Sequence, residues 1–396
     1  MNTQELIVTA EQVFVPNYGK RTLVLDHGKG AEVWDTEGRR YLDFVAGIAV
    51  NALGHADPVM AAVLAEQATR LVHTSNLFLN APAIQLAQLL VERSFADKVF
   101  FANSGAEAVE GAFKFARKVA YDGQHTGKTA IVAFEGAFHG RTMGAVAATH
   151  RLKYREPFAP LMPGVRFAPF NDLAAAAQVI DHNVCAVIVE PIQGEGGINS
   201  ATPEFLQGLR QLCDQHGALL IVDEIQAGGG RTGDLWAYQQ SGIRPDMLVF
   251  AKPLGGGLPI GAILVTDAVA AHIHPGDHGS TFAGGPLVCA VALAVFQRLS
   301  DPQFLEHVRD VGDHLERRLL ELQQAAPQIQ EIRGRGLMRG VRVTGSAAAV
   351  KEVAQEAGLL IVTAGDDVIR LVPPLIIERP QVDEAIGILR HALEVL

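Results

Sequence analysis

The stretch from residue 219 to residue 262 constrains the fold more than any other part of the chain. It contains two short apolar runs, residues 219–222 and 247–251, and each is followed by a charged residue and a glycine-rich turn. Short apolar runs between turn signals are typical of buried parallel strands rather than of helices. Asp223 and Lys252 are therefore expected at the carboxyl ends of two strands, where α/β proteins bind their ligands.

An acid and a lysine at neighbouring strand ends indicate one chemistry above others. The amine of Lys252 can form a Schiff base with an aldehyde cofactor, while the carboxylate of Asp223 holds the ring nitrogen of that cofactor protonated. This pair predicts pyridoxal-phosphate catalysis with Lys252 and Asp223 as the catalytic residues. The alternative is that both are ordinary charges at strand ends, and the rest of the sequence has to decide between the two.

An apolar run that ends in Asp-Glu is also typical of the Mg²⁺-binding strand of nucleoside triphosphatases. Such enzymes need a phosphate-binding loop of the pattern GxxxxGK[ST]. The nearest match ends in Gly127-Lys128-Thr129, but Asp122 occupies the position of its first glycine. The segment that follows is strand-like, whereas the phosphate loop opens a helix. The sequence therefore argues against a triphosphatase.

Composition narrows the class of protein further. The 396 residues, 48% of them hydrophobic, suffice for about two or three domains with large cores. The net charge is −10, so there is no basic field for nucleic acid or an anionic membrane, and no apolar run approaches the ~20 residues that span a bilayer. Three distant cysteines match no metal spacing and suit a reducing compartment. We expect a cytoplasmic enzyme that binds small molecules and neither nucleic acid, membrane nor metal.

Further apolar runs at residues 99–102, 130–134 and 185–189 also end in polar clusters, with helical segments between them. Together with the first two runs they predict an α/β fold with a mostly parallel central sheet and a ligand site along one edge. The C-terminal part alternates strands and helices as a smaller α+β domain does. We predict a large domain at residues 51–297 and a small domain at residues 298–396, which the N-terminal segment 1–50 joins.

The residues after the strand at 99–102 form a candidate phosphate site. Ser104 and Glu107 have the S-x-x-E spacing of a capping box, so a helix is expected to begin here. A strand that passes through Ser104, Gly105 and Ala106 into a helix presents free backbone N–H groups to an anion. A well-capped helix without a ligand is the alternative.

Residues near other strand ends could bind a planar cofactor or a carboxylate. Phe138 can stack on a ring, and Arg141 can hold a carboxylate through two hydrogen bonds. For Phe138 the alternative is packing in the core. His139, in the same segment, is either an acid or base or a structural histidine. Arg370 lies within an apolar run and needs an anionic partner, either a substrate carboxylate or a structural ion pair.

These residues fall within motifs that run from about residue 15 to the C-terminus. The motifs are GKGAEVWDTEGRRYLDF, AVNALGH, HTSNLF, ANSGAEA, FHGRT, VEPIQGEGGI, LLIVDEIQ with GGGRTG, AKPLGGGLPIGA, GSTF and RLVPPL. Together they resemble the class III aminotransferases, which are pyridoxal-phosphate enzymes of fold type I. Within that family the chain is most similar to the branch that acts on N-acetylornithine.

The resemblance implies a role for each matching residue. Lys252 is the Schiff-base lysine and proton carrier, and Asp223 pairs with the pyridinium nitrogen. The other cofactor-binding positions are Ser104, Gly105, Ala106, Phe138, Gln226, Ser280 and Thr281. Thr281, and Ser280 with it, reach the cofactor from a partner subunit, so the resemblance implies a homodimer with shared active sites.

The same resemblance assigns the substrate contacts and the reaction. Tyr18 and Arg141 contact the α-carboxylate of the amino donor, and Arg370 binds 2-oxoglutarate but pairs with Glu195 when that acceptor is absent. The terminal amino group of N-acetylornithine would pass to 2-oxoglutarate, giving N-acetylglutamate 5-semialdehyde and glutamate, as in arginine biosynthesis. Gly47 stands where ornithine aminotransferases tend to carry tyrosine, which leaves room for an acyl group on the donor.

Several alternatives stay open. The donor could instead be succinylornithine, succinyl-diaminopimelate, ornithine, 4-aminobutyrate or an amine linked to a carrier protein, and aminomutases and decarboxylases share the fold. The chain also departs from the usual family pattern at Ala106, Val109, Ala227 and Gly285, none of which belongs to the catalytic pair.

Overall fold

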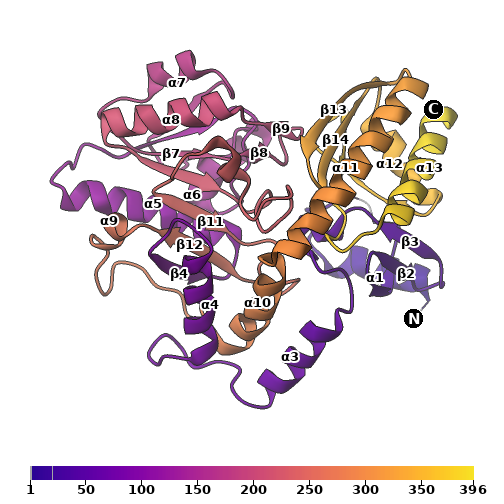
Figure 1. The fold of residues 1–396 in the computed structure, drawn as a ribbon, viewed down its shortest axis with the longest axis horizontal. Helices are drawn as coiled ribbons and strands as arrows, with labels where there is room; N and C mark the ends of the chain where they lie inside the picture. The colour runs from indigo at the N-terminus through magenta and orange to yellow at the C-terminus, as the bar shows by residue number, and fades with distance from the viewer. Residues whose placement is uncertain (1, 20) are drawn as a thin grey trace.

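The computed structural model describes residues 2–19 and 21–396, and a seven-stranded sheet forms its centre (Figure 1). The strand order is β4-β12-β11-β10-β7-β5-β6, and β12 runs antiparallel to both of its neighbours. The strands are β4 (Lys98–Ala102), β5 (Ala130–Phe134), β6 (Val165–Ala168), β7 (Val184–Val189), β10 (Leu219–Asp223), β11 (Met247–Phe250) and β12 (Gly261–Val265).

Helices cover both faces of this sheet, which explains why its strands are apolar along their whole length. In β7, Val187 packs into a core with Phe205 of α8 (Pro203–His216), whereas the next residue, Ile188, packs into a core with Ala112 of α5 (Gly105–Asp122). Successive side chains of a strand point to opposite faces, so both kinds of position are buried. Polar residues are therefore expected only where the strands end.

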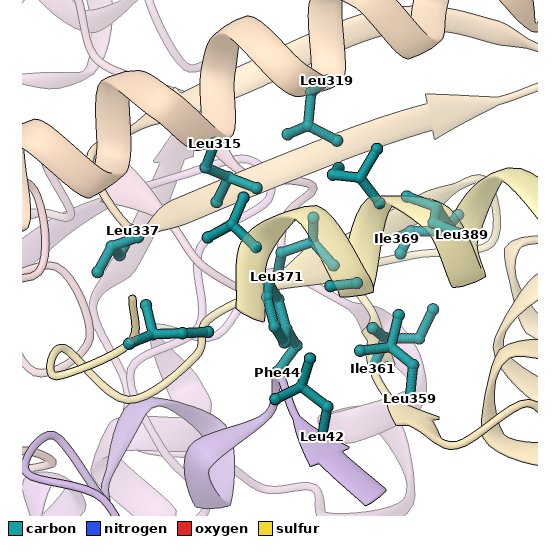
Figure 2. Close-up of a cluster of buried hydrophobic side chains, with 14 of the residues drawn as sticks. Leu42, Phe44, Leu315, Leu319, Leu337, Leu359, Ile361, Ile369, Leu371 and Leu389 are labelled. Atoms are coloured by element: carbon teal, nitrogen blue, oxygen red, sulfur yellow. The ribbon is translucent and has the colours of Figure 1, made fainter. Parts of the chain in front are cut away.

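Two smaller sheets pack together beside the large one. The first joins β1 (Leu25–Lys29), β2 (Glu32–Asp35) and β3 (Arg40–Asp43) to β15 (Leu359–Leu360), and the second has the order β13-β14-β17-β16. Figure 2 shows the core they share, in which Phe44 lies close to Leu371, with Leu42 beside Phe44 and Leu389 beside Ile369. The N-terminal strands thus pack against the C-terminal elements. The domain boundaries at residues 50 and 297 stay a prediction.

The remaining elements connect or cover these sheets. The helices are α1 (Thr3–Val13), α2 (Ala46–Ala49), α3 (Pro58–Ala68), α4 (Ala81–Glu92), α6 (Met143–Ala147), α7 (Leu173–Val179), α9 (Asp267–Ala270), α10 (Pro286–Leu299), α11 (Pro302–Ala325), α12 (Ala347–Glu356) and α13 (Arg379–Val395). The other strands are β8 (Ile192–Gln193), β9 (Asn199–Ser200), β13 (Ile329–Arg335), β14 (Met338–Val343), β16 (Val362–Thr363) and β17 (Val368–Leu371). The 3₁₀ turns are η1 (Leu152–Tyr154), η2 (Glu156–Phe158) and η3 (Ala237–Ser241). Within the described part of the chain, no helix is both long and apolar enough to cross a membrane.

The predicted fold class is confirmed, and all five predicted strands of the large sheet exist within a residue of their expected ends. β6 and β12 were not predicted from the sequence. A glycine-rich turn joins β11 directly to β12, and a connection this short can only produce an antiparallel neighbour. Because β12 runs antiparallel, the polar residues that follow it, Thr266 and Asp267, lie at the opposite edge of the sheet from the predicted site.

Candidate active site

A cavity of about 450 Å³ opens at the carboxyl edge of the large sheet. Its walls come from the segments that follow β4, β5, β7, β10 and β11 and from the turn before β12. The residues that line it are Val50, Asn103, Ser104, Gly105, Ala106, Phe138, His139, Gly140, Arg141, Glu190, Asp223, Ile225, Gln226, Ala251, Lys252, Gly257, Leu258, Pro259 and Ile260. The structure thus brings eight of the predicted site residues to one cavity.

Lys252 follows β11 and lies half-buried in this cavity. Burial, assisted by the positive charge of Arg370, lowers the pKa of Lys252 to about 8, although Glu195 and Asp223 act in the opposite direction. A lysine with this pKa is neutral in a substantial fraction of molecules near neutral pH. Its amine can therefore act as a nucleophile or as a base, which an ordinary surface lysine cannot do to the same extent.

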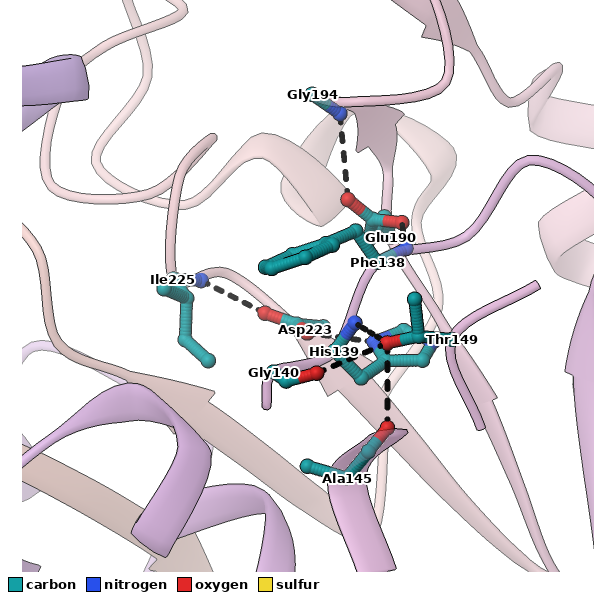
Figure 3. A network of polar contacts seen from close by, with 9 residues as sticks. All are labelled: Phe138, His139, Gly140, Ala145, Thr149, Glu190, Gly194, Asp223 and Ile225. Atoms are coloured by element: carbon teal, nitrogen blue, oxygen red, sulfur yellow. Dashed lines mark hydrogen bonds and ion pairs between the residues drawn. The ribbon is translucent and has the colours of Figure 1, made fainter. Parts of the chain in front are cut away.

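Asp223 is held by a buried network that Figure 3 shows from close by. Its Oδ1 accepts a hydrogen bond from the backbone N–H of Ile225 at 3.0 Å, and its Oδ2 lies 2.7 Å from Nδ1 of His139. The backbone N–H of His139 in turn donates to the hydroxyl of Thr149 at 3.0 Å. Burial alone would lower the pKa of His139, but the hydrogen bond to Asp223 and the charges of Asp223 and Glu190 raise it above its ordinary value. The imidazole therefore orients the Asp223 carboxylate.

Glu190 is a second buried acid in the same network. Its carboxylate accepts hydrogen bonds from the backbone N–H groups of Phe138 at 3.1 Å and Gly194 at 3.2 Å. Burial raises the pKa of Glu190 to about 7, against the opposing charge of His139. Glu190 thereby ties the loop that carries Phe138 to the loop that leads to Glu195.

No functional role of His139 or Glu190 was predicted from the sequence. For Glu190 a signal was present, since an acid directly follows the buried strand β7. For His139 the deciding fact is its contact with Asp223, which is 84 positions away in the sequence.

The N-terminus of α5 opens into the cavity as predicted. Ser104 caps the helix, and its hydroxyl accepts a hydrogen bond from the backbone N–H of Glu107 at 3.2 Å. The reciprocal half of the predicted capping box is wrong, because the carboxylate of Glu107 binds the backbone N–H of Asn103 at 2.8 Å instead of that of Ser104. A Cβ at Gly105 would lie 2.8 Å from the side chain of Ile225, so glycine allows the close approach of this turn to the segment that follows β10.

Arg370, on β17, is 2% exposed and lies just behind the cavity wall. Its Nη1 donates to Oε1 of Glu195 at 2.6 Å and to Oε1 of Gln226 at 3.1 Å. The sequence left two partners of Arg370 open, a substrate carboxylate and a structural ion pair. The described structure contains the ion pair, with Glu195. Since Gln226 lines the cavity, this pair lies next to the space that a substrate would occupy.

Three predicted residues are not at the cavity of their own chain. Tyr18 is 71% exposed and lines a different cavity beside α1. Ser280 contacts the site only indirectly, because its hydroxyl accepts a hydrogen bond from Nδ2 of Asn103 at 2.8 Å, and Thr281 is exposed. Their predicted roles require a surface that the single chain does not supply.

The four departures from the family pattern lie at different kinds of position. Ala106 lines the cavity, where it offers no hydroxyl but keeps its backbone N–H. Val109 and Ala227 are buried in cores, and Gly285 is the N-cap of α10.

Pyridoxal phosphate fits this donor set. A half-buried lysine with a lowered pKa, an oriented buried carboxylate and a helix N-terminus suit its aldehyde, its ring nitrogen and its phosphate respectively. The fold and the site therefore define an α/β enzyme of the pyridoxal-phosphate class.

Comparisons with known proteins give the family. A family model described as aminotransferase class-III matches residues 13–393. A mitochondrial acetylornithine aminotransferase of Alnus glutinosa is 48% identical over 100% of this chain and 88% of its own length, and a succinylornithine transaminase of Salmonella paratyphi A is 47% identical over 97% and 94%. An ornithine aminotransferase of Toxoplasma gondii, a solved structure described with PLP at its active site, superposes with a TM-score of 0.95 at 34% identity, covering 100% of this chain and 95% of that one.

The chain belongs to the class-III aminotransferases, a family of pyridoxal-phosphate enzymes. The family, fold and cofactor predicted from the sequence are thereby confirmed. The roles of the individual site residues stay predictions.

Proposed function

We propose that this chain transfers the terminal amino group of N-acetylornithine to 2-oxoglutarate, giving N-acetylglutamate 5-semialdehyde and glutamate in arginine biosynthesis. One observation carries the proposal. Lys252 and Asp223 line one cavity whose wall, at Gln226, adjoins the ion pair of Arg370 and Glu195. This combination provides for proton transfer and for two carboxylate-bearing substrates.

The cofactor would be held by residues from several strand ends. Ser104, Gly105 and Ala106 would bind its phosphate, Phe138 would stack on its ring, and Gln226 would hydrogen-bond its phenolic oxygen. When bound, pyridoxal phosphate supplies an aldehyde that condenses with amines and a ring that withdraws electrons from the adjacent carbon. Asp223, held in place by His139, would keep the ring nitrogen protonated.

Lys252 would move the proton in each half-reaction. Its amine, neutral in a substantial fraction of molecules near neutral pH, would take a proton from the terminal carbon of the donor and deliver it to the cofactor side of the bond. The reverse transfer would serve the acceptor. One group can do both because the pKa of about 8 lies close to the working pH.

The pair of Arg370 and Glu195 would let one pocket accept two different substrates. With Glu195 in place, the charge of Arg370 is neutralised, which suits a donor without an acid at that position. When Glu195 moves away, Arg370 can bind a carboxylate of 2-oxoglutarate through its planar fork. Glu195 is the more exposed partner, with 25% of its side chain accessible compared with 2% for Arg370, so it is the partner that can move.

The donor assignment is supported by the relatives and by Gly47. Gly47 lies in a left-handed turn at φ +63°, and a Cβ there would meet nothing closer than 3.5 Å. A large side chain is thus absent next to Val50, which lines the cavity. We propose that this space admits the acyl group, so that succinylornithine is a second donor, consistent with the name of the Salmonella relative.

Absorption spectroscopy tests the proposed function. N-acetylornithine is expected to convert the visible band of the bound cofactor to the amine form within seconds, and succinylornithine should do so more slowly. Ornithine and 4-aminobutyrate, added in parallel at equal concentration, are expected to convert it by less than about a tenth of that rate. Adding 2-oxoglutarate should restore the band with release of glutamate. A band that only ornithine or 4-aminobutyrate converts would contradict the donor assignment, and isomerised product without 2-oxoglutarate would indicate a mutase.

We further propose that the active unit is a homodimer. The loop with Leu77 (82% exposed), Phe78 (70%) and Leu79 (89%) adjoins the loop with Phe282 (67%), because Nδ2 of Asn76 donates to the carbonyl of Ser280 at 2.6 Å. Exposed apolar side chains gathered in this way mark protein interfaces. In the single chain, Thr281 does not line the cavity. A second copy that packs on this face would bring its own Thr281 there.

Sedimentation equilibrium should accordingly give about twice the chain mass of 42.3 kDa. Leu79→Asp is expected to shift the mass towards that of one chain, since it places a charge in the buried interface. Tyr121→Asp, at an exposed residue on α5, is the matched control and should leave the mass unchanged. A monomeric wild-type protein with full activity would refute the shared site.

A further inference from the structure

Arg141 is held at the cavity in an unusual way. It is exposed, and its guanidinium carbon lies 3.6 Å from the ring centroid of Tyr154 and 5.5 Å from that of Phe138. Within residues 2–19 and 21–396, its guanidinium makes no hydrogen bond and no ion pair. Aromatic faces therefore fix the position of this arginine.

Stacking of this kind has a specific consequence for ligand binding. A guanidinium that lies flat on an aromatic face is held by dispersion and by the ring quadrupole, and its five N–H donors stay available. A salt bridge would hold the arginine equally well but would occupy the donors that a carboxylate needs. A free arginine would keep its donors but would lose rotamer freedom each time a ligand bound. The stacked arrangement avoids both costs.

Tyr154 is itself fixed on several sides. It ends the short turn η1, and its backbone N–H donates to the carbonyl of Arg151 at 3.0 Å. Its ring meets that of Phe138 edge to face, with centroids 6.2 Å apart at 85°. Nη2 of Arg151 donates to the carbonyl of Glu195 at 3.0 Å, and Arg155 packs over the ring of Phe167 at 4.6 Å. Tyr154 is thus a half-buried, anchored platform rather than a mobile surface residue.

We propose that Tyr154 is a positioning residue that holds Arg141 ready for the α-carboxylate of the amino donor. The inference rests on the proposed function, in which Arg141 binds that carboxylate. Tyr154 touches neither the reacting carbon nor Lys252, and it acts through Arg141 alone. It selects amines that carry a carboxylate over amines that lack one.

Binding of an unreactive donor analogue tests this role without turnover. N-acetyl-L-norvaline keeps the acetamido group and the carboxylate of the donor but has no terminal amine, and its dissociation constant can be measured by calorimetry on the cofactor-loaded enzyme. Tyr154→Leu is expected to raise that constant about fivefold, as loss of one cation–π contact predicts, while Tyr154→Phe restores most of the affinity. Tyr121→Leu, at an exposed tyrosine away from the cavity, is the control for loss of a surface tyrosine.

Kinetics separate a positioning role from a merely structural one. In Tyr154→Leu, KM for N-acetylornithine should rise by about the same factor as the dissociation constant of N-acetyl-L-norvaline. The change in kcat should be smaller. Conversion of the cofactor band by n-butylamine, which has no carboxylate, should proceed at the wild-type rate. If Tyr154→Leu slowed the conversion by n-butylamine as much as that by N-acetylornithine, the proposal would be overturned, because the variant would then have damaged the site in general.

Arg141→Ala distinguishes failure of this inference from failure of the function on which it rests. If Arg141→Ala leaves the affinity for N-acetylnorvaline unchanged, the assigned donor contact is wrong, and the role of Tyr154 is wrong with it. If Arg141→Ala weakens binding but Tyr154→Leu does not, the donor contact stands and only the positioning role is refuted. Weakening by both variants, with recovery in Tyr154→Phe, supports the proposal.

Discussion

Replacing Lys252 with alanine is expected to slow transamination of N-acetylornithine by more than about a thousandfold. Loss of the amine removes both the nucleophile and the group that carries the proton. Among residues 2–19 and 21–396, no other lysine lines the cavity, and two buried bases that do line it, His139 and Glu190, are already engaged in hydrogen bonds. The measurement is the single-turnover rate of the cofactor band after N-acetylornithine is added, with glutamate release as the second readout.

Lys98→Ala, at an exposed lysine that pairs with Asp267 on the surface, is the matched control and should keep the wild-type rate. Because the cavity of about 450 Å³ leaves room for a small molecule once the lysine side chain is gone, methylamine is expected to restore part of the activity of Lys252→Ala. A Lys252→Ala variant with near-normal turnover would refute the assignment of the base. If Lys252→Ala binds the cofactor weakly but, with excess cofactor and no methylamine, still transfers the proton at a near-normal rate, Lys252 has an anchoring role only.

The large sheet was predictable because one physical rule governs it. A strand that is covered on both faces must be apolar throughout, so a charge appears only where it ends, and the carboxyl ends of parallel strands meet at one edge. Asp223 and Lys252 could therefore be placed together from sequence. The next residue, Glu224, does not line the cavity. Its carboxylate instead accepts hydrogen bonds from the backbone N–H groups of Ala237 and Tyr238.

Contacts between distant segments were beyond the sequence pattern. Phe138, His139 and Arg141 share one turn, yet each has a different partner: the ring of Phe138 lines the cavity, His139 binds Asp223, and Arg141 stacks on Tyr154. Spacing places such residues on a loop but does not say which way each side chain turns. The same holds for Glu190, whose two acceptor contacts depend on how two loops pack.

Other residues could not be placed because, in the dimer proposed above, their surroundings would come from a second chain. Tyr18 and Thr281 were assigned from the resemblance, and in the described structure both are exposed and away from the cavity. Neither periodicity nor turn chemistry reports on a partner subunit. The exposed apolar loop at Leu77 to Leu79 is the feature on which the proposed partner rests, and its exposure is known only from the folded structure.

Asp223→Asn is the second variant for which we expect a large effect, a loss of at least about a hundredfold in the rate of the donor half-reaction. The amide keeps the shape of the carboxylate and can still accept the hydrogen bond from Ile225, but it carries no charge. The ring nitrogen of the cofactor would then lose the anion that keeps it protonated, and the ring would withdraw electrons less strongly. The rate is measured from the cofactor band at saturating N-acetylornithine, with Asp267→Asn as an exposed control.

A second readout of the same variant does not depend on catalysis. The pKa of His139 is raised by its hydrogen bond to Asp223 and by the charge of that residue, while burial acts to lower it. Without the charge, burial prevails, so NMR titration of His139 should show its pKa fall in Asp223→Asn. If the pKa falls but the rate is retained, the Asp223–His139 pair orders the site without serving the chemistry. If both fall together, the buried histidine and the ring nitrogen depend on one carboxylate, which explains why the chain buries that carboxylate and holds both of its oxygens.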